Sequence, residues 1–465
     1  MNNSHNMKKN QILLGLAIIL SLVFCGELAI RAYYFNLDSL ANSTGKYLPD
    51  FYNNFDKFDK LRTVIEYFCL NIIYILWLII NKNQQTDITF TKILKNSSFF
   101  LLIALISYPI TTDINLYVHY GLMNLNGINP FINSAGTFTS KLSAFLVWKQ
   151  TSTYGPVSQL FFTFSAIFVA ITPSLGIYVF KLICLLFHIL NAYLIWRHLK
   201  NSPYKVNVTI AYLVNPFLLY EQVINAHIDV FISTVLIILV ICLKNRNYIA
   251  AIITAWIGFL IKTLPIIWLP LLFVYLIKQK RWKTLFTAIC ISIAIIFAAY
   301  IIALPTVDAW RSLLNPGVEG KVSSSLHALV KKLISLKILD FPLSFQQNIF
   351  SIFKSLMFSI FLLSYLIILV KPYWKKNYSE TNLSINIGWI TLILFLFAAP
   401  WYCSWYSSVL LGVAALNIHS KRFVITSILL CIPSTTVTVG ITLLPALAAI
   451  IFWFARDIKA QKKLV

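Results

Sequence analysis

The chain has 465 residues; 59% of them are hydrophobic, 11% are charged, and the formal net charge is +23. A soluble domain is about half apolar and about a quarter charged, so this composition excludes an ordinary soluble enzyme. Such a basic excess suggests nucleic-acid binding in a soluble protein, but here Lys and Arg form short clusters between apolar runs. Clusters of this kind mark cytoplasmic loops, so the sequence predicts a polytopic membrane protein without a nucleic-acid partner.

The first apolar run, Gln11 to Ile30, follows Lys8 and Lys9 and is not followed by a small-residue cleavage site. We therefore expect a retained membrane helix and not a signal peptide. Two further runs, at about 63–81 and 97–110, bring the chain across the membrane twice more. With the first lysines in the cytoplasm, the segment that follows the third run lies on the outer side.

The next two apolar runs are Pro156 to Thr172 and Gly176 to Trp196, and the basic cluster from Arg197 to Lys205 comes after them. An odd number of crossings must separate the outer segment from this cluster if the cluster is cytoplasmic. One of the two runs therefore does not span. The first run is the shorter, and we expect it to be a helix embedded at the outer side. The alternative is that the cluster at Arg197 breaks the charge rule.

Basic clusters farther along the chain fix the remaining crossings and give about fourteen spanning helices, with both termini in the cytoplasm. The predicted fold is an all-α bundle. Two outer segments are too long to be turns: Asp113 to Thr172, and about Pro305 to Gln347. The seven cysteines form no CxxC pair and six of them lie in apolar runs, so we expect neither a disulfide framework nor a metal site.

Asp113, Glu221 and Asp229 stand at helix edges on the outer side, in a chain with only 15 acidic residues. A carboxylate at the bilayer centre costs about 2.5 to 3.5 kcal/mol, so one at a helix edge is usually paired, hydrated or functional. Asp113 is followed at helical spacing by Tyr117 and Tyr120, as in an interfacial helix with tyrosines at headgroup depth. Alternatively, Asp113 after "TT" is only a helix cap.

Glu221 and Asp229 flank the segment "QVINAHI", which predicts a polar turn on the outer face; the alternative is a loop with solvated charges. His227 in this segment is a weak signal by itself. Lys262 stands in "GFLIKTLPIIWLP", on the outer face against the positive-inside bias. It either snorkels to the interface or holds an anionic group such as a lipid phosphate.

Five segments in order resemble the polyprenyl-phosphate-sugar-dependent glycosyltransferases of the GT-C superfamily, above all the bacterial polyprenyl-phosphate-mannose mannosyltransferases. The segments are "TTDINLYVHYGLMNLNGINPF", "WKQTSTYGPVSQLFF", "NPFLLYEQVINAHIDVF", "FLIKTLPIIWLPLLF" and "PWYCSWY". The resemblance implies a GT-C-like membrane domain over 1–465, with a catalytic part at 97–420, additional N-terminal helices at 1–96 and C-terminal helices at 421–465. It also implies that Asp113 is the catalytic base and that the helix opening with "YGP" packs beside the active site without crossing. Relatives carry a Gly-His-Asn-Asp-like string where this chain has "AHID", so the acceptor is not implied.

The function implied is inverting transfer of a hexose, with mannose expected first, from a polyprenyl phosphate to a lipid-linked or glycan acceptor. A fixed cation would stabilise the leaving phosphate; the candidates are Lys262, Arg311, Lys321 and His327. The candidates for substrate contacts are Tyr117, Tyr154, Glu221, His227, Asp229, Trp401, Tyr402 and Trp405. Interfacial belts would place the same aromatic residues there without any sugar.

We expect no organic cofactor; a divalent metal held by Asp113 with Glu221 or Asp229 is the open alternative. The expected location is the inner (plasma) membrane, with the active site on the extracytoplasmic face. The main rival from another class is a lipid or sugar transporter or flippase, which predicts inverted repeats and polar groups near helix centres. The chain shows no such repeat, and its polar groups gather at one face.

Overall fold

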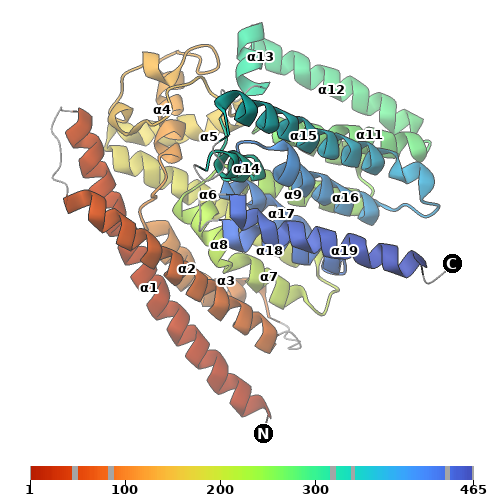
Figure 1. The fold of residues 1–465 in the computed structure, drawn as a ribbon, viewed down its shortest axis with the longest axis horizontal. Coiled ribbons are helices and arrows are strands. Elements are labelled where there is room, and N and C mark those ends of the chain that lie inside the picture. The colour runs from red at the N-terminus through yellow and green to blue at the C-terminus, as the bar shows by residue number, and fades with distance from the viewer. Residues whose placement is uncertain are drawn as a thin grey trace. The chain divides into compact units, whose positions relative to one another are not determined.

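The computed structural model describes residues 2–43, 51–81, 88–314, 321–336, 341–434 and 440–462. All regular elements among these residues are helices, with two isolated β-bridges and no strand, as the all-α prediction requires (Figure 1). The chain divides into two compact units, which are described separately. The first unit comprises residues 1–234, 260–263 and 299–317, and the second unit comprises 235–259, 264–298 and 318–465.

The helices of the first unit are α1 (Asn2–Ser43), α2 (Phe51–Asn81), α3 (Phe90–Ile106), α4 (Asp113–Leu125), α5 (Pro156–Ile167), α6 (Pro173–His198), α7 (Lys205–Leu213), α8 (Pro216–Leu218) and α13 (Val307–Leu314). Those of the second are α10 (Tyr248–Phe259), α11 (Leu269–Lys278), α14 (Leu326–Ile334), α15 (Leu343–Trp374), α16 (Glu380–Ile393), α17 (Ser408–Leu416), α18 (Lys421–Ser434) and α19 (Leu444–Lys462). Two helices, α9 (Asp229–Lys244) and α12 (Trp282–Ile302), contribute residues to both units.

Seven helices within the described residues are long and apolar enough to cross a membrane, which makes this a membrane protein. They are Lys9–Ile30, Leu61–Asn81, Pro173–His198, Trp282–Ile302, Leu343–Trp374, Glu380–Ala398 and Gly440–Asp457. Four shorter apolar helices accompany them: Pro156–Ala170, Tyr248–Phe259, Leu264–Lys278 and Ser404–Leu416. The count of about fourteen crossings stays a prediction.

The local sequence explains where α5 and α6 begin. Pro156 and Pro173 stand at the first helical positions, where a missing N–H costs nothing. The hydroxyl of Thr172 caps α6 by accepting a hydrogen bond from the Leu175 N–H at 3.1 Å. The 12 residues of α5 rise about 18 Å, whereas a bilayer core is about 30 Å thick. The α-helical part of this run is thus shorter than a bilayer core, and the expectation that the run does not span stays a prediction.

Helices α4 and α5 pack at unusually close range. A Cβ placed on Gly121 would lie 2.1 Å from the carbonyl oxygen of Phe162, so only glycine permits this approach. The ring of Tyr117 stacks on that of Phe162 with a 5.0 Å centroid separation. Tyr117 and Tyr120 are 1% and 0% exposed. The close contact with α5 therefore encloses both side chains in protein, and the prediction that they lie at headgroup depth stays a prediction.

The second long outer segment predicted from the sequence, about Pro305 to Gln347, contains α13 in the first unit and α14 in the second. Residues 315–320 and 337–340 of this segment lie outside the described residues. Inside the second unit, α16 is held by polar contacts of buried aromatic residues. The Trp268 indole N–H donates to the Thr391 hydroxyl at 2.9 Å, and the Tyr248 hydroxyl donates to the Glu380 carboxylate at 2.7 Å.

Candidate active site

Asp113 is the first residue of α4, and its carboxyl group is 15% exposed. Thr112 occupies the N-cap position, so the alternative that Asp113 is the helix cap was wrong. The Asp113 N–H donates to the hydroxyl of Thr111 at 3.3 Å, which fixes the backbone at the start of the helix. A carboxylate in the first helical turn also interacts favourably with the helix dipole.

The chain between α7 and α9 is irregular, and it carries the polar side chains of Glu221, His227 and, at the start of α9, Asp229. The side chain of Asn215 caps α8 by accepting from the Leu218 N–H at 3.1 Å. A single π-helical segment, Leu219–Ile224, then carries Glu221. Ala226 turns the chain with a φ of +51°, and α9 starts at Asp229. Irregular backbone of this kind at membrane depth is tolerated only inside protein or around a cavity.

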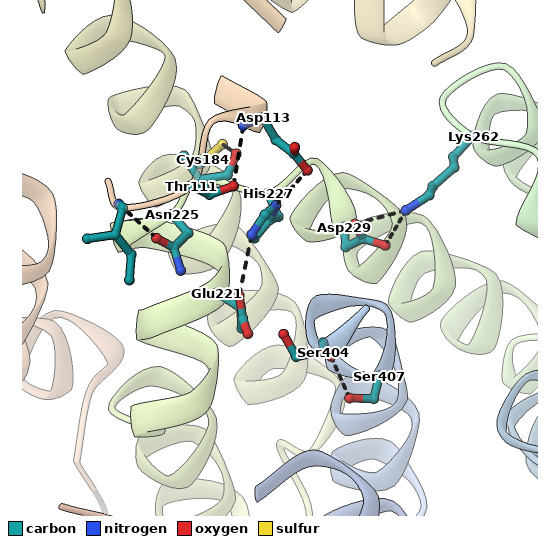
Figure 2. A network of polar contacts seen from close by, with 12 residues as sticks. Thr111, Asp113, Cys184, Glu221, Asn225, His227, Asp229, Lys262, Ser404 and Ser407 are labelled. Atoms are coloured by element: carbon teal, nitrogen blue, oxygen red, sulfur yellow. Dashed lines mark hydrogen bonds and ion pairs between the residues drawn. The ribbon is translucent and has the colours of Figure 1, made fainter. Parts of the chain in front are cut away.

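His227 lies between two carboxyl groups (Figure 2). Its Nδ1 is 3.9 Å from Oδ2 of Asp113, and its Nε2 is 3.4 Å from Oε2 of Glu221. Glu221, His227 and Asp229 are each 1% exposed. The alternative of a loop with solvated charges was therefore wrong, because the broken segment folds into the protein and not over its surface.

Lys262 is bound by Asp229. Its ammonium group donates to both carboxylate oxygens of Asp229 at 3.0 Å (Figure 2). The lysine side chain is 17% exposed and that of the aspartate 1%. The snorkelling alternative was wrong for Lys262, since its charge faces a buried partner within the same unit.

The "YGP" segment holds Lys262 in place through the backbone. Tyr154 and Lys262 form an isolated antiparallel bridge, and the Gly155 N–H donates to the Ile261 carbonyl at 2.8 Å. A Cβ on Gly155 would lie 2.2 Å from the carbonyl oxygen of Leu260. The glycine of this motif is thus required for close approach of two backbones, one of which carries the lysine.

Burial and neighbouring charges shift the acid–base properties of two of these groups. Burial raises the pKa of Asp113 to about 6; Lys262 opposes this shift and Asp229 adds to it. Burial lowers the pKa of His227 well below its usual value, and Lys262 acts in the same direction. The site therefore combines a carboxyl group that titrates near neutrality with a neutral imidazole, an arrangement suited to proton transfer.

The other predicted residues of the first unit take different positions. Tyr154 is half-buried and meets the Tyr117 ring edge-on at 4.9 Å. Arg311 is exposed and forms a surface ion pair with Asp308 at 3.3 Å. The structure thus gathers Asp113, Glu221, His227, Asp229 and Lys262, but leaves Arg311 outside this cluster.

The remaining predicted residues belong to the second unit. Lys321 is exposed, whereas His327 is 2% exposed and meets the Phe353 ring edge-on. Trp401 forms an isolated bridge with Ser323, and the Tyr402 N–H donates to the Ser323 carbonyl at 2.9 Å. Trp405 meets the Tyr406 ring edge-on.

Sequence reasoning missed Lys181. It is fully buried in α6, and its ammonium donates to the carbonyls of Ala104 and Ser107, at the end of α3 that leads to Asp113. A single lysine inside a run of 26 apolar-rich helical residues was a signal, because intramembrane charges are costly and usually have a task. Asn225 was also missed; its side-chain oxygen accepts from the Ile110 N–H at 3.3 Å.

No group of three His, Cys, Asp or Glu side chains among the described residues is placed to hold a metal ion. The cluster instead offers a carboxylate–imidazole–carboxylate series beside a paired ammonium group. Such a set can accept a proton from a hydroxyl group and can place a cation near an anionic group.

A family model described as alpha-(1->6)-mannopyranosyltransferase, N-terminal domain, matches residues 24–278. The match covers 255 of the 465 residues and includes all five members of the cluster. No curated protein and no solved structure matched the chain.

Proposed function

The chain belongs to the alpha-(1->6)-mannopyranosyltransferase family, and on this basis we propose that it transfers a mannosyl group from a polyprenyl phosphate to a hydroxyl of a lipid-linked or glycan acceptor. The buried Asp113, facing His227 in the first unit, is the observation that carries the proposal. We place the reaction at the extracytoplasmic face of the plasma membrane, with both termini in the cytoplasm, because of the distribution of basic clusters.

In this reaction Asp113 removes the proton from the acceptor hydroxyl while its oxygen attacks the anomeric carbon. The bond between that carbon and the phosphate oxygen breaks, and the polyprenyl phosphate leaves with the bonding electrons. Attack from the face opposite the phosphate inverts the anomeric centre, so an α-linked product requires a β-linked donor. The transition state would be oxocarbenium-like, as in glycoside hydrolysis.

His227 would stabilise Asp113 after it has taken up the proton. A neutral imidazole has one N–H donor and one acceptor nitrogen. If Nε2 carries the hydrogen and donates to Glu221, then Nδ1 presents its lone pair to Asp113. The newly protonated carboxyl can donate to that nitrogen once the two groups approach. Catalytic hydrogen bonds are often long before substrate binds, so 3.9 Å is compatible with this role.

Lys262 remains our first candidate for the leaving phosphate. An ammonium group has three N–H donors. Asp229 holds the Lys262 ammonium group in a fixed place, while the lysine side chain stays 17% exposed. A fixed cation stabilises the growing negative charge on the phosphate more than it stabilises the ground state. Within the first unit, Arg311 is the further phosphate candidate and Tyr154 is the candidate for a sugar contact, whereas Tyr117 is too deeply buried for one. The roles of Lys321, His327, Trp401, Tyr402 and Trp405, which belong to the second unit, stay predictions.

The test is a transfer assay with polyprenyl phosphates of β-mannose, α-mannose, glucose, galactose and arabinose, with membrane extracts as the acceptor source. We expect transfer from the β-mannosyl donor to give an α-linked product. Asp113→Asn should lower the rate by about 10² to 10⁴, the usual value of a placed general base. Asp457→Asn is the matched control, because this exposed carboxylate belongs to a surface ion pair.

Two results would overturn the proposal. Full activity of Asp113→Asn would show that Asp113 is not the general base. If reconstituted protein moved sugar lipids across vesicles and formed no glycosidic bond with any donor, the transporter alternative would replace the transferase.

A further inference from the structure

The first unit contains an apolar cavity of about 540 Å³ apart from the Asp113 cluster, lined by α1, α2, α3 and residues between 210 and 224. Its volume lies in the range of about 300 to 1,000 Å³ that small-molecule sites occupy. Most lining side chains are aliphatic or aromatic, among them Leu13, Ala17, Ile73 and Phe100. Leu14, which also lines it, is 50% exposed, so the cavity reaches the protein surface beside α1.

One end of the cavity is closed by aromatic rings. Tyr220 meets Phe24 at a centroid separation of 5.8 Å and Tyr67 at 6.0 Å, and all three residues line the cavity. Tyr220 precedes Glu221 in the π-helical segment. This closed end is therefore the end nearer the candidate active site.

The other end is polar. Asn10 of α1 and Asn81 of α2 exchange two side-chain hydrogen bonds of 3.0 Å. Asn96 and Ser97, near the start of α3, line the cavity together with Asn10. Because α3 begins nine residues after α2 ends, the first turns of α3 lie at the same polar end of the cavity as Asn81.

Exposed lysines lie at this polar end. Lys9 is next to Asn10 in α1, and Lys92 and Lys95 are in the first two turns of α3, beside Asn96. All three are exposed. Apolar lining, amide groups at one end and three cations beside them match the chemistry of an anionic lipid, with its chain inside and its headgroup at the lysines.

We propose that this cavity binds an acyl chain of an anionic membrane phospholipid, whose phosphate contacts Lys9, Lys92 and Lys95. The polyprenyl tail of a sugar donor fits less well. Its phosphate would have to lie toward Asp113, at the end that the three aromatic rings close. The positive-inside rule assigns the lysine end to the cytoplasmic leaflet, where anionic phospholipids are abundant.

The test is native mass spectrometry and thermal unfolding of the full chain in detergent, with added phosphatidylglycerol or phosphatidylcholine. We expect one bound phosphatidylglycerol per chain and a rise in the unfolding midpoint with that lipid. Ala17→Trp should abolish both effects, because the indole fills the cavity. Ile19→Trp is the matched control, since Ile19 is 62% exposed on the same helix and does not line the cavity.

A second variant keeps the test decisive if Ala17→Trp does not fold. Lys92→Gln/Lys95→Gln changes two surface residues and should weaken phosphatidylglycerol binding by roughly 30-fold, while leaving phosphatidylcholine binding unchanged. Equal binding of both lipids by the wild type, or retention of phosphatidylglycerol by Ala17→Trp, would overturn the proposal. A co-purified polyprenyl lipid in place of the phospholipid would overturn it as well. These readouts do not depend on transferase activity.

Discussion

At the scale of single residues, the site is defined by where charge is buried. Asp113 retains a small exposed area, whereas its neighbour His227 and the Glu221 carboxyl group on the other side of that imidazole are enclosed. A general base works best when its pKa lies near the working pH. Burial raises the pKa of Asp113 to about 6, which is a value suited to the base that we propose.

The first prediction concerns pH. The base proposed for this reaction, Asp113, works only in its ionised form, so the proposal predicts that kcat/KM falls about tenfold per pH unit below an apparent pKa of about 6. Asp229→Asn removes a negative charge that raises this pKa and should therefore move the acid limb to lower pH. The measurement is kcat/KM across the pH range for both proteins. An acid limb that moved to higher pH in Asp229→Asn would contradict the assignment.

The second prediction concerns stability. The pKa of Asp113 in the folded protein lies above the ordinary 3.8, so the ionised group opposes folding at all pH values above that ordinary value. Asp113→Asn has no charge to bury and should unfold at the same temperature as the wild type or higher at pH 7. Thermal unfolding followed by tryptophan fluorescence tests this. A lower midpoint would mean that Asp113 is chiefly a structural residue.

The third prediction concerns Lys181. Its ammonium satisfies two carbonyls at the end of α3, and Tyr178 from the same helix donates to the Ile106 carbonyl at 2.9 Å. Lys181→Met should cost about 1 to 3 kcal/mol because buried carbonyls lose their donor. Since α3 leads to Asp113, kcat should fall while the donor KM changes little.

Tyr178→Phe is the control for Lys181→Met, because it removes a single hydrogen bond at the same helix end. It should have a smaller effect on both unfolding and kcat. If Lys181→Met raised the donor KM and left kcat unchanged, Lys181 would act on the substrate and not on the position of Asp113.

At the scale of elements, the site depends on the short helix α5. Three hydrogen bonds join the N-terminal end of α5 to the carbonyls of Leu260 and Ile261. The Gly155 N–H and the Ser158 hydroxyl donate to the Ile261 carbonyl at 2.8 and 2.9 Å, and the Val157 N–H donates to the Leu260 carbonyl at 2.9 Å. These contacts hold the backbone that carries Lys262. The "YGP" motif is therefore a docking element for the lysine segment, which explains its glycine on physical grounds.

The fourth prediction follows from that docking. Gly155 has an ordinary φ of −66°, so substitution is limited by space and not by backbone strain. Gly155→Ala would place Cβ 2.2 Å from the Leu260 oxygen and should displace Lys262, with a large rise in donor KM. Donor titrations measure this. Gly26→Ala is the control, because nothing lies within 4 Å of its Cβ position; the donor proposal for Lys262 fails if both variants behave alike.

At the scale of the whole molecule, the sequence predicted the class of fold, the membrane location, the family and the start of α4 at Asp113. It could not predict that His227 lies beside Asp113, because 114 residues separate them and only the packing of the broken segment brings them together. Lys262 and Asp229 were both expected on the outer side, but their pairing was not predicted, since it arises where the chain also bridges Lys262 to Tyr154 of the "YGP" segment. The burial of Tyr117 was not predicted, because periodicity alone does not distinguish a headgroup belt from a close helix–helix contact.

The last prediction concerns topology, where the parity of crossings separates two arrangements of the chain. If α5 does not span, the turn before α6 lies outside, and the cluster after α6 lies inside. If α5 spans, both positions exchange sides. Ser174 and Lys200 are exposed positions in these two places.

In a variant whose native cysteines are replaced, a cysteine at Ser174 should react with an impermeant maleimide in intact cells, and one at Lys200 only after permeabilisation. The opposite pattern would show that α5 crosses and that the cluster at Arg197 breaks the positive-inside rule. It would also put Asp113 and Arg197 on the same side of the membrane, because two crossings would then separate them.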